Sequence, residues 1–196
     1  IIEKNTYFRT SPKYRHGNFM KTLDILLKNY IKENKHDTNA IKMLNFYKNN
    51  KNCFSKDNTK GHFTGSAWII NPAKNAVLMT HHKKLNMWLQ LGGHADGDNN
   101  LINVALRESE EESGFSNFKL LSEEIFDLDI HEIESMNDDP RHFHYDVRFL
   151  LEADPIKSEI IVSDESHDVK WILLSEVNNY NSEDSIKRMV DKTIRL

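Results

Sequence analysis

The chain has 196 residues, 38% hydrophobic and 29% charged, a balance typical of a folded globular protein that excludes a largely disordered chain. The formal net charge is −4 and no block of basic residues stands out, so we expect no nucleic-acid polymer as a partner. The longest apolar stretches, such as residues 67–70, are too short to cross a bilayer, and no secretory signal is visible.

Two helices are predicted before residue 60. Apolar side chains recur at helical spacing from about Gly17 to Asn34. These side chains are Phe19, Leu23, Leu26, Leu27, Tyr30 and Ile31. A second helix is expected to begin after Asp37 or Thr38, either of which could cap it, and the short link between the two predicts a helical hairpin.

We therefore divide the chain into an N-terminal helical extension at 1–58 and a main domain at 59–196. Three roles are possible for the extension: it could cap a substrate cleft, form a dimer interface or enlarge the core. Cys53, near its end, is the only cysteine in the chain. No internal disulfide can form, and we expect a cytoplasmic protein.

After residue 60 the pattern changes to strands separated by turn residues, with helices between some of them. The predicted strands are residues 62–70, 76–80, 88–91, 119–129, 142–151 and 169–173. The predicted helices are 101–113, ended by Gly114, and 184–194. Strands interleaved with helices in this way predict an α/β (α+β) domain with a mixed sheet.

One face of the helix at 101–113 is rich in carboxylates. At about 100° per residue, Glu108, Glu111 and Glu112 fall within roughly a 100° arc, and Glu110 points to nearly the opposite side. Like charges on one face destabilise a helix, so the pattern predicts a bound cation. Oxygen ligands without cysteine favour Mg²⁺, or Mn²⁺, completed by substrate phosphates. Arg107 is placed to orient one carboxylate through a bidentate pair.

The same segment resembles the signature of the Nudix hydrolase family, which here spans Gly93 to Phe115. The residues that match the signature at its required spacing are Gly93, Arg107, Glu108, Glu111, Glu112, Gly114 and Phe115. Asn99 replaces the first glutamate of the signature, and Ser109 replaces a buried aliphatic residue. The resemblance implies a Nudix-type α/β/α sandwich around a mixed sheet, preceded here by the helical extension.

The resemblance also implies a divalent-metal-dependent hydrolase that cleaves the pyrophosphate linkage of a nucleoside diphosphate joined to another group. Glu111 and Glu112 would bind Mg²⁺ or Mn²⁺, and Glu108 would act as a further ligand or as the base. Together with Arg107 they form the expected catalytic set. The carbonyl of Gly92 is a further expected ligand, because the family's loop often supplies one.

Many family members add a carboxylate from a loop just before a late, tryptophan-bearing strand. Glu165, ahead of Trp171, is the candidate for this additional metal ligand. A loop acid that only bonds its own backbone is the open alternative. The resemblance also implies a nucleotide-like substrate, and dimers are frequent in the family, so a homodimer is a further expectation.

Several basic and polar residues are expected to contact the substrate. Lys83 precedes the signature and could form part of an electropositive rim for phosphates, and His94 lies within the glycine loop. His142, His144 and Asp146 alternate along a predicted strand and would share one face. Histidine spacings here match no standard zinc motif, so we favour substrate-contact or surface roles over a zinc site.

Two alternative functions make different demands on the sequence. The family includes isopentenyl diphosphate isomerases, which use a cysteine near the glycine loop, and this chain has none there. The domain could instead be a catalytically weakened nucleotide-binding or regulatory module. Asn99 supports that alternative, whereas the retained Arg107, Glu108, Glu111 and Glu112 favour the hydrolase.

Overall fold

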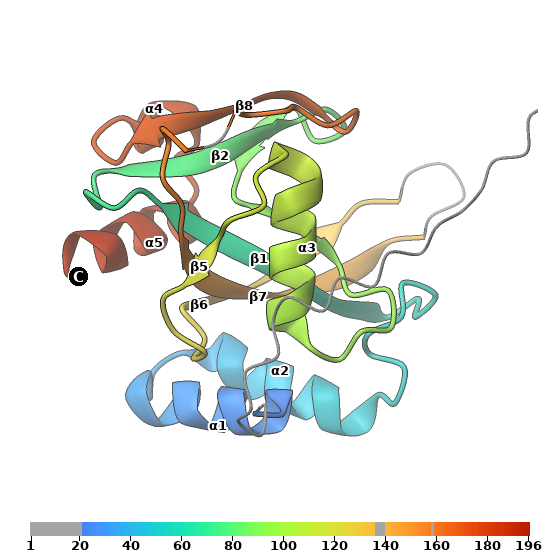
Figure 1. Cartoon of the computed structure of the whole chain (residues 1–196). Coiled ribbons are helices and arrows are strands. Elements are labelled where there is room, and N and C mark those ends of the chain that lie inside the picture. Colours follow the sequence, from blue (N-terminus) through green and yellow to red (C-terminus); the bar gives the residue numbers. More distant parts are fainter. Residues whose placement is uncertain (1–20, 136–139, 158) are drawn as a thin grey trace, which may run out of the picture.

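The computed structural model describes residues 21–135, 140–157 and 159–196 (Figure 1). Within these ranges the helices are α1 (Leu23–Glu33), α2 (Thr38–Asn49), α3 (Leu101–Ser113), α4 (Val177–Tyr180) and α5 (Asp184–Ile194). The strands are β1 (Gly61–Ile70), β2 (Ala76–His82), β3 (Met87–Leu89), β4 (Leu91–His94), β5 (Lys119–Leu120), β6 (Asp127–Ile133), β7 (His142–Glu152) and β8 (Ser166–Leu173).

One mixed sheet organises the domain, and β1 is its centre. β1 pairs antiparallel with β2 and β4 and parallel with β7. β7 also carries β5 and β6, and β2 carries β3 and β8, all antiparallel. The register sets Thr64 of β1 beside His94 of β4, and His62 beside His144 of β7.

Side-chain alternation along β1 builds the two faces of the sheet. Phe63, Ala67 and Ile69 belong to a core shared with α1, α2 and α3, whereas Trp68 and Ile70 belong to a second core with α4 and α5. In Figure 1, α3 crosses in front of β1, with α1 and α2 beneath the sheet. The predicted α/β/α sandwich with a mixed sheet is confirmed.

The N-terminal hairpin enlarges the core of the domain. Leu27, Met43 and Phe46 are buried in the same core as Phe63, and the ring of Phe46 stacks on Tyr145 of β7 with centroids 3.9 Å apart. Of the three roles expected for the hairpin, the structure supports this one. The boundary at residues 58/59 stays a prediction, since the helices and the sheet share one hydrophobic core.

The structure of the hairpin also shows which residue caps the second helix. The Asp37 carboxylate accepts hydrogen bonds from the backbone N–H groups of Asn39 and Ala40, so Asp37 rather than Thr38 caps α2. In the first helix, the predicted start at Gly17 and the apolar Phe19 lie outside the described residues.

Two sequence predictions in the sheet were wrong in detail. The strand predicted at 88–91 is two strands, β3 and β4, and the second continues through the glycines that we expected to form a loop. The strand predicted at 119–129 is likewise split into β5 and β6. α4 was not predicted, because four residues are too few to show a helical period. None of the described helices has the length and apolarity needed to span a bilayer.

Candidate active site

The carboxylate-bearing helix α3 packs directly on the central strand. Asn100 caps its start by accepting from the backbone N–H of Asn103, and Gly114 ends it in the left-handed conformation with φ 72°. A Cβ added at Gly65 of β1 would lie 2.7 Å from the carbonyl oxygen of Leu101. Only a glycine permits this close approach, which fixes the height of α3 above the sheet.

Two glycines of β4 receive the carboxylates of α3. The backbone N–H of Gly92 donates to Oε2 of Glu112 at 2.8 Å. A Cβ added at Gly93 would lie 2.4 Å from Oε2 of Glu108, so this carboxylate lies against the bare strand backbone. The helix places Glu108 and Glu112 on one face, and the continuation of β4 through these glycines, which was not predicted from sequence, supplies the backbone against which both carboxylates lie.

Arg107 is the cation that balances this cluster. Its Nη1 atom lies 2.6 Å from Oε1 of Glu108 and 3.6 Å from Oε2 of Glu111, and its Nη2 atom donates to the carbonyl of His94 at 3.0 Å. The guanidinium thus ties α3 to the end of β4. A lysine could not make these contacts simultaneously, because they use the forked geometry of the guanidinium.

Burial and crowding disfavour ionisation of the two inner carboxyls. Burial, opposed by Arg107 and reinforced by the charges of Glu111 and Glu165, raises the pKa of Glu108 to about 7. Burial also raises the pKa of Glu112 to about 8. The hydrogen bond from the Gly92 N–H lowers this pKa, whereas the charges of Glu108 and Glu165 raise it further. A cation at this position would favour the ionised forms, which is the behaviour of a metal-binding carboxylate cluster.

The stability of the metal-free protein is expected to fall as pH rises from 6.5 to 8.5. The folded-state pKa values of Glu108 and Glu112 lie above the ordinary value of 4.5, so the unfolded chain releases these protons first. The stabilisation is fully present below pH 4.5 and is lost as pH rises toward 8. We expect a loss of about 2 kcal/mol, or about 5 °C in Tm, over this window.

Thermal unfolding in chelator and in excess Mg²⁺ measures this effect. Mg²⁺ should reduce the pH-dependent loss, because it binds the ionised carboxylates of the folded state only. An equal loss in the Glu112→Gln variant would assign the pH dependence to other groups and contradict the prediction.

The carboxylates suit Mg²⁺ or Mn²⁺ because they offer oxygen ligands, although they do not surround one point as a complete coordination shell would. Glu111 turns outward toward Arg107, and its side chain is 61% exposed. In the described part of the chain, the three carboxylates of α3 do not form a group with ligand atoms within 4.8 Å of one another. Mg²⁺ keeps several waters and takes only one or two carboxylates plus phosphate oxygens, so such an open arrangement suits it.

The loop before β8 approaches the same cluster. The charge of Glu165 contributes to the raised pKa of both Glu108 and Glu112. The backbone N–H of Lys83 donates to the carbonyl of Glu165 at 2.9 Å, and its ammonium donates to the carbonyl of Asp164 at 2.7 Å. The structure therefore ties Lys83 to the loop that carries Glu165.

The predicted histidines gather on the other face of β4. The ring centroid of His94 lies 5.1 Å from that of His144, and His142 and His144 are 5.1 Å apart. A further histidine, His62 of β1, lies 4.8 Å from His144 and was missed. Its signal in the sequence is weak, because it lies 80 positions before His142 and only the parallel pairing of β1 with β7 brings them together.

Burial keeps the imidazole of His144 neutral. Burial, with the neighbouring rings of His131, His94, His62 and His142, lowers the pKa of His144 to about 2. This ring therefore carries no charge at neutral pH and cannot attract a phosphate as a cation. A neutral imidazole can still accept a hydrogen bond, donate one or coordinate a metal.

Asp146 lies inside the sheet rather than at its surface. It is 2% exposed, and one oxygen accepts hydrogen bonds from the hydroxyls of Thr64 and Ser66. The other oxygen accepts from Gln90 and Arg148. Both oxygens are engaged within the protein, so a substrate contact would have to displace one of these partners.

Comparison with models of protein families shows to which family the chain belongs. The model of the NUDIX domain matches residues 62–192, well over half of the sequence. The chain belongs to the Nudix family. No curated protein matches it in sequence.

Solved structures of Nudix proteins share the fold of this chain. The dihydroneopterin triphosphate pyrophosphohydrolase of E. coli is 16% identical with a TM-score of 0.53, over 68% of this chain and 96% of that one. The MutT protein of Methanosarcina mazei Go1 is 16% identical with a TM-score of 0.51, over 68% of this chain and 92% of that one. At this identity the likeness establishes the Nudix fold alone.

The two departures from the Nudix signature have different surroundings. Asn99 is exposed in the loop before the Nudix helix α3. The nearby acids are engaged elsewhere, since Asp98 accepts from the backbone N–H of Asn100 and Asp96 lies 3.6 Å from Lys56. Ser109 is fully buried, and its hydroxyl donates to the carbonyl of Ala105 at 2.6 Å, so the helix satisfies the polar group that replaces an aliphatic one.

Proposed function

We propose that this Nudix protein is a divalent-metal-dependent hydrolase that cleaves the pyrophosphate linkage of a nucleoside diphosphate joined to another group. The observation that carries the proposal is the position of Glu108 and Glu112 against the glycine backbone of β4. A buried and a partly buried carboxylate with raised pKa values, crowded by further acids, are arranged for a cation and its phosphate ligand.

In this proposal Glu111 and Glu112 hold Mg²⁺ or Mn²⁺, with Glu108, Glu165 and the carbonyl of Gly92 as further ligands. The bound ion would neutralise phosphate charge and lower the pKa of a coordinated water. The protein orients this set, because Gly92 fixes Glu112 through its N–H and Gly93 leaves room for Glu108.

Arg107 and Glu108 have the remaining chemical roles. The pKa of Glu108, raised to about 7, makes this carboxylate suited to accept a proton from water near neutral pH. Arg107 holds it at 2.6 Å and would limit its motion during turnover. Lys83, which bonds the loop that carries Glu165, and His94, at the end of β4, are the proposed contacts to the substrate phosphates.

The first test is hydrolysis of a substrate panel by the metal-free protein supplemented with Mg²⁺ or Mn²⁺. The panel holds oxidised nucleoside triphosphates, ADP-ribose, dinucleoside polyphosphates and nucleotide sugars. We expect metal-dependent turnover of at least one class, lost in the Glu111→Gln/Glu112→Gln variant. Glu110→Gln is the control, because it makes the same chemical substitution once on the other side of the helix and should leave turnover intact.

The alternative proposal is a nucleotide-binding or regulatory module, which Asn99 favours. Saturable nucleotide binding without turnover of any panel member, at either metal, would contradict the hydrolase and support this module. A homodimer and a cytoplasmic location stay predictions from sequence.

A further inference from the structure

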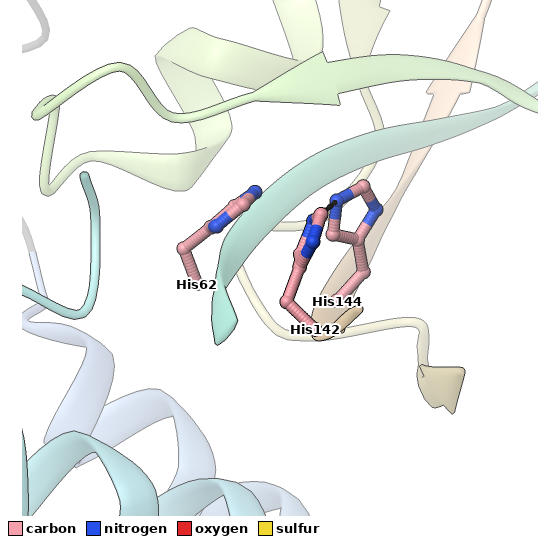
Figure 2. Close-up of side chains that lie close together, drawn as sticks. All are labelled: His62, His142 and His144. Atoms are coloured by element: carbon pink, nitrogen blue, oxygen red, sulfur yellow. Dashed lines mark hydrogen bonds between the residues drawn. The ribbon is translucent and has the colours of Figure 1, made fainter. Parts of the chain in front are cut away.

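Three histidines converge on the sheet, apart from the carboxylates of the Nudix helix. Figure 2 shows His62 from β1 facing His142 and His144 from β7. One ring nitrogen from each lies within 4.8 Å of the other two, and no other group of three or more metal-ligating side chains among residues 21–135, 140–157 and 159–196 is that close. The three ring centroids form a nearly equilateral triangle with sides of 5.0, 4.8 and 5.1 Å.

We propose that His62, His142 and His144 form a binding site for a divalent transition metal, for which Zn²⁺ is the best match. The spacing of the nitrogens agrees with this ion. Nε2 of His142 and Nε2 of His144 are 3.2 Å apart. Two nitrogens that share a tetrahedral Zn²⁺ at its usual bond length are separated by about 3.3 Å.

The backbone orients one ligand of the site. Nδ1 of His142 lies 2.7 Å from the carbonyl oxygen of Pro140, which can only accept, so Nδ1 carries the proton. In the neutral ring Nε2 is then the unprotonated nitrogen, and it is the one that faces His144. Zinc-ligating histidines characteristically donate their other ring N–H to a carbonyl or carboxylate in this way.

The sheet holds the three ligands in place before a metal arrives. The parallel register of β1 and β7 sets His62 beside His144, and His142 is two residues along the same strand and therefore on the same face. His62 and His142 are only 2% and 5% exposed. Ligands on strands of a packed sheet, rather than on a loop, reduce the ordering that metal binding requires.

Strand alternation separates this site from the proposed magnesium site. In β4, Gly93 faces Glu108, whereas the ring of the next residue, His94, lies 5.0 Å from that of His62. The two sites therefore lie on opposite faces of β4. Their donors differ as well, since imidazole nitrogens select Zn²⁺ and related ions whereas carboxylate oxygens suit Mg²⁺.

Three protein ligands leave a fourth coordination position on Zn²⁺. His144 is only partly buried, so water can reach the site from its side. His94 flanks the group, with its ring centroid 5.0 Å from that of His62 and 5.1 Å from that of His144. A three-histidine site with an open position is able to take a water or an anionic oxygen as its fourth ligand.

The test is metal binding by the full chain, freed of any affinity tag and treated with chelator. Titration with Zn²⁺ and with Co²⁺ in the presence of excess Mg²⁺ should give one tightly bound ion per chain, with the visible absorption of tetrahedral Co²⁺. His62→Ala and His144→Ala should each weaken binding by more than about 100-fold, since loss of an outer-shell partner alone costs 10–100-fold.

Control variants distinguish metal binding at the three histidines from binding elsewhere on the protein. His36→Ala removes an exposed histidine between α1 and α2 and should leave binding unchanged, as should Glu111→Gln/Glu112→Gln. Circular dichroism and Tm identify any variant that fails to fold, and His144→Gln then replaces it with a side chain of similar size.

Two results would overturn the proposal: no bound ion in the wild-type protein, or binding that survives both His62 and His144 substitutions. Because the readout is binding and not turnover, it is independent of the hydrolase assay. Failure of either proposal leaves the other to stand on its own result.

Discussion

Replacing Glu112 by Gln is expected to remove most of the hydrolytic activity and, at the same time, to stabilise the metal-free protein. The two effects have one cause, because Glu112 is a carboxylate whose burial raises its pKa to about 8. Ionising it without a cation costs folding free energy, and the same ionised form is the proposed ligand of the catalytic metal.

The size of each effect follows from what glutamine keeps and loses. Its amide oxygen can still accept from the Gly92 N–H, so the local geometry is retained. The negative charge is lost, and we expect kcat to fall by about three orders of magnitude, or ~4 kcal/mol. At pH 8.5 without metal we expect a gain of about 1–2 kcal/mol in the free energy of unfolding.

Urea unfolding in chelator at pH 8.5 and steady-state kinetics in Mg²⁺ measure the two effects on the same preparations. Glu110→Gln again provides the control, with little change in either quantity. A Glu112→Gln protein that is both inactive and destabilised would mean that the carboxylate is needed for folding, and would contradict this account.

The helix that carries the chemistry could be predicted from sequence almost to the residue. Leu101–Ser113 was expected from its apolar period and from Gly114, and both bounds agree with the structure. The last helix, Asp184–Ile194, was predicted equally well. In both, local signals are sufficient, because caps and periodicity act within one or two turns.

The strand through Gly92 and Gly93 could not be predicted in that way. Glycines are poor strand formers, so the local pattern favoured a loop. Their place in β4 depends on Ser66, whose backbone leaves room only for glycine at Gly92, and on Glu108, whose carboxylate occupies the space that a side chain at Gly93 would need. This is tertiary information, and it explains why the sequence identified the carboxylates but not the surface against which they lie.

The proposed histidine site could not be predicted from the sequence for a related reason. His142 and His144 were recognised as sharing a face, and the absence of a standard zinc spacing argued against a metal. The third ligand comes from another strand, and parallel pairing leaves no short-range spacing signal. A motif search can only recognise ligands that are close in sequence.

Replacing Asp127 by Ala is expected to cost about 3–5 kcal/mol of stability, because it removes the buried carboxylate shared by Arg148, Arg188 and Lys192. Asp127 is fully buried and accepts two hydrogen bonds from Arg188, each 2.8 Å long. Lys192 donates to it at 2.7 Å, and Arg148, itself 3% exposed, lies 3.3 Å away.

This network connects the last helix to the faces that carry the proposed sites. Arg188 and Lys192 belong to α5, whereas Arg148 belongs to β7 and also donates to Asp146, which holds Thr64 of β1. Loss of Asp127 should therefore loosen the docking of α5 and the polar face of the sheet together. Charged groups in one network are coupled, so the cost should exceed that of any single pair.

Urea unfolding of Asp127→Ala against Asp184→Ala measures this cost. Asp184 has the same side chain, lies on α5 and is almost fully exposed at 3.7 Å from Lys187, so its loss should cost less than about 1 kcal/mol. If Asp127→Ala costs no more than Asp184→Ala, water must replace the carboxylate within the network. The charges around Asp127 would then be hydrated in solution, and the docking of α5 would rest on its apolar contacts, Ile186 and Met189.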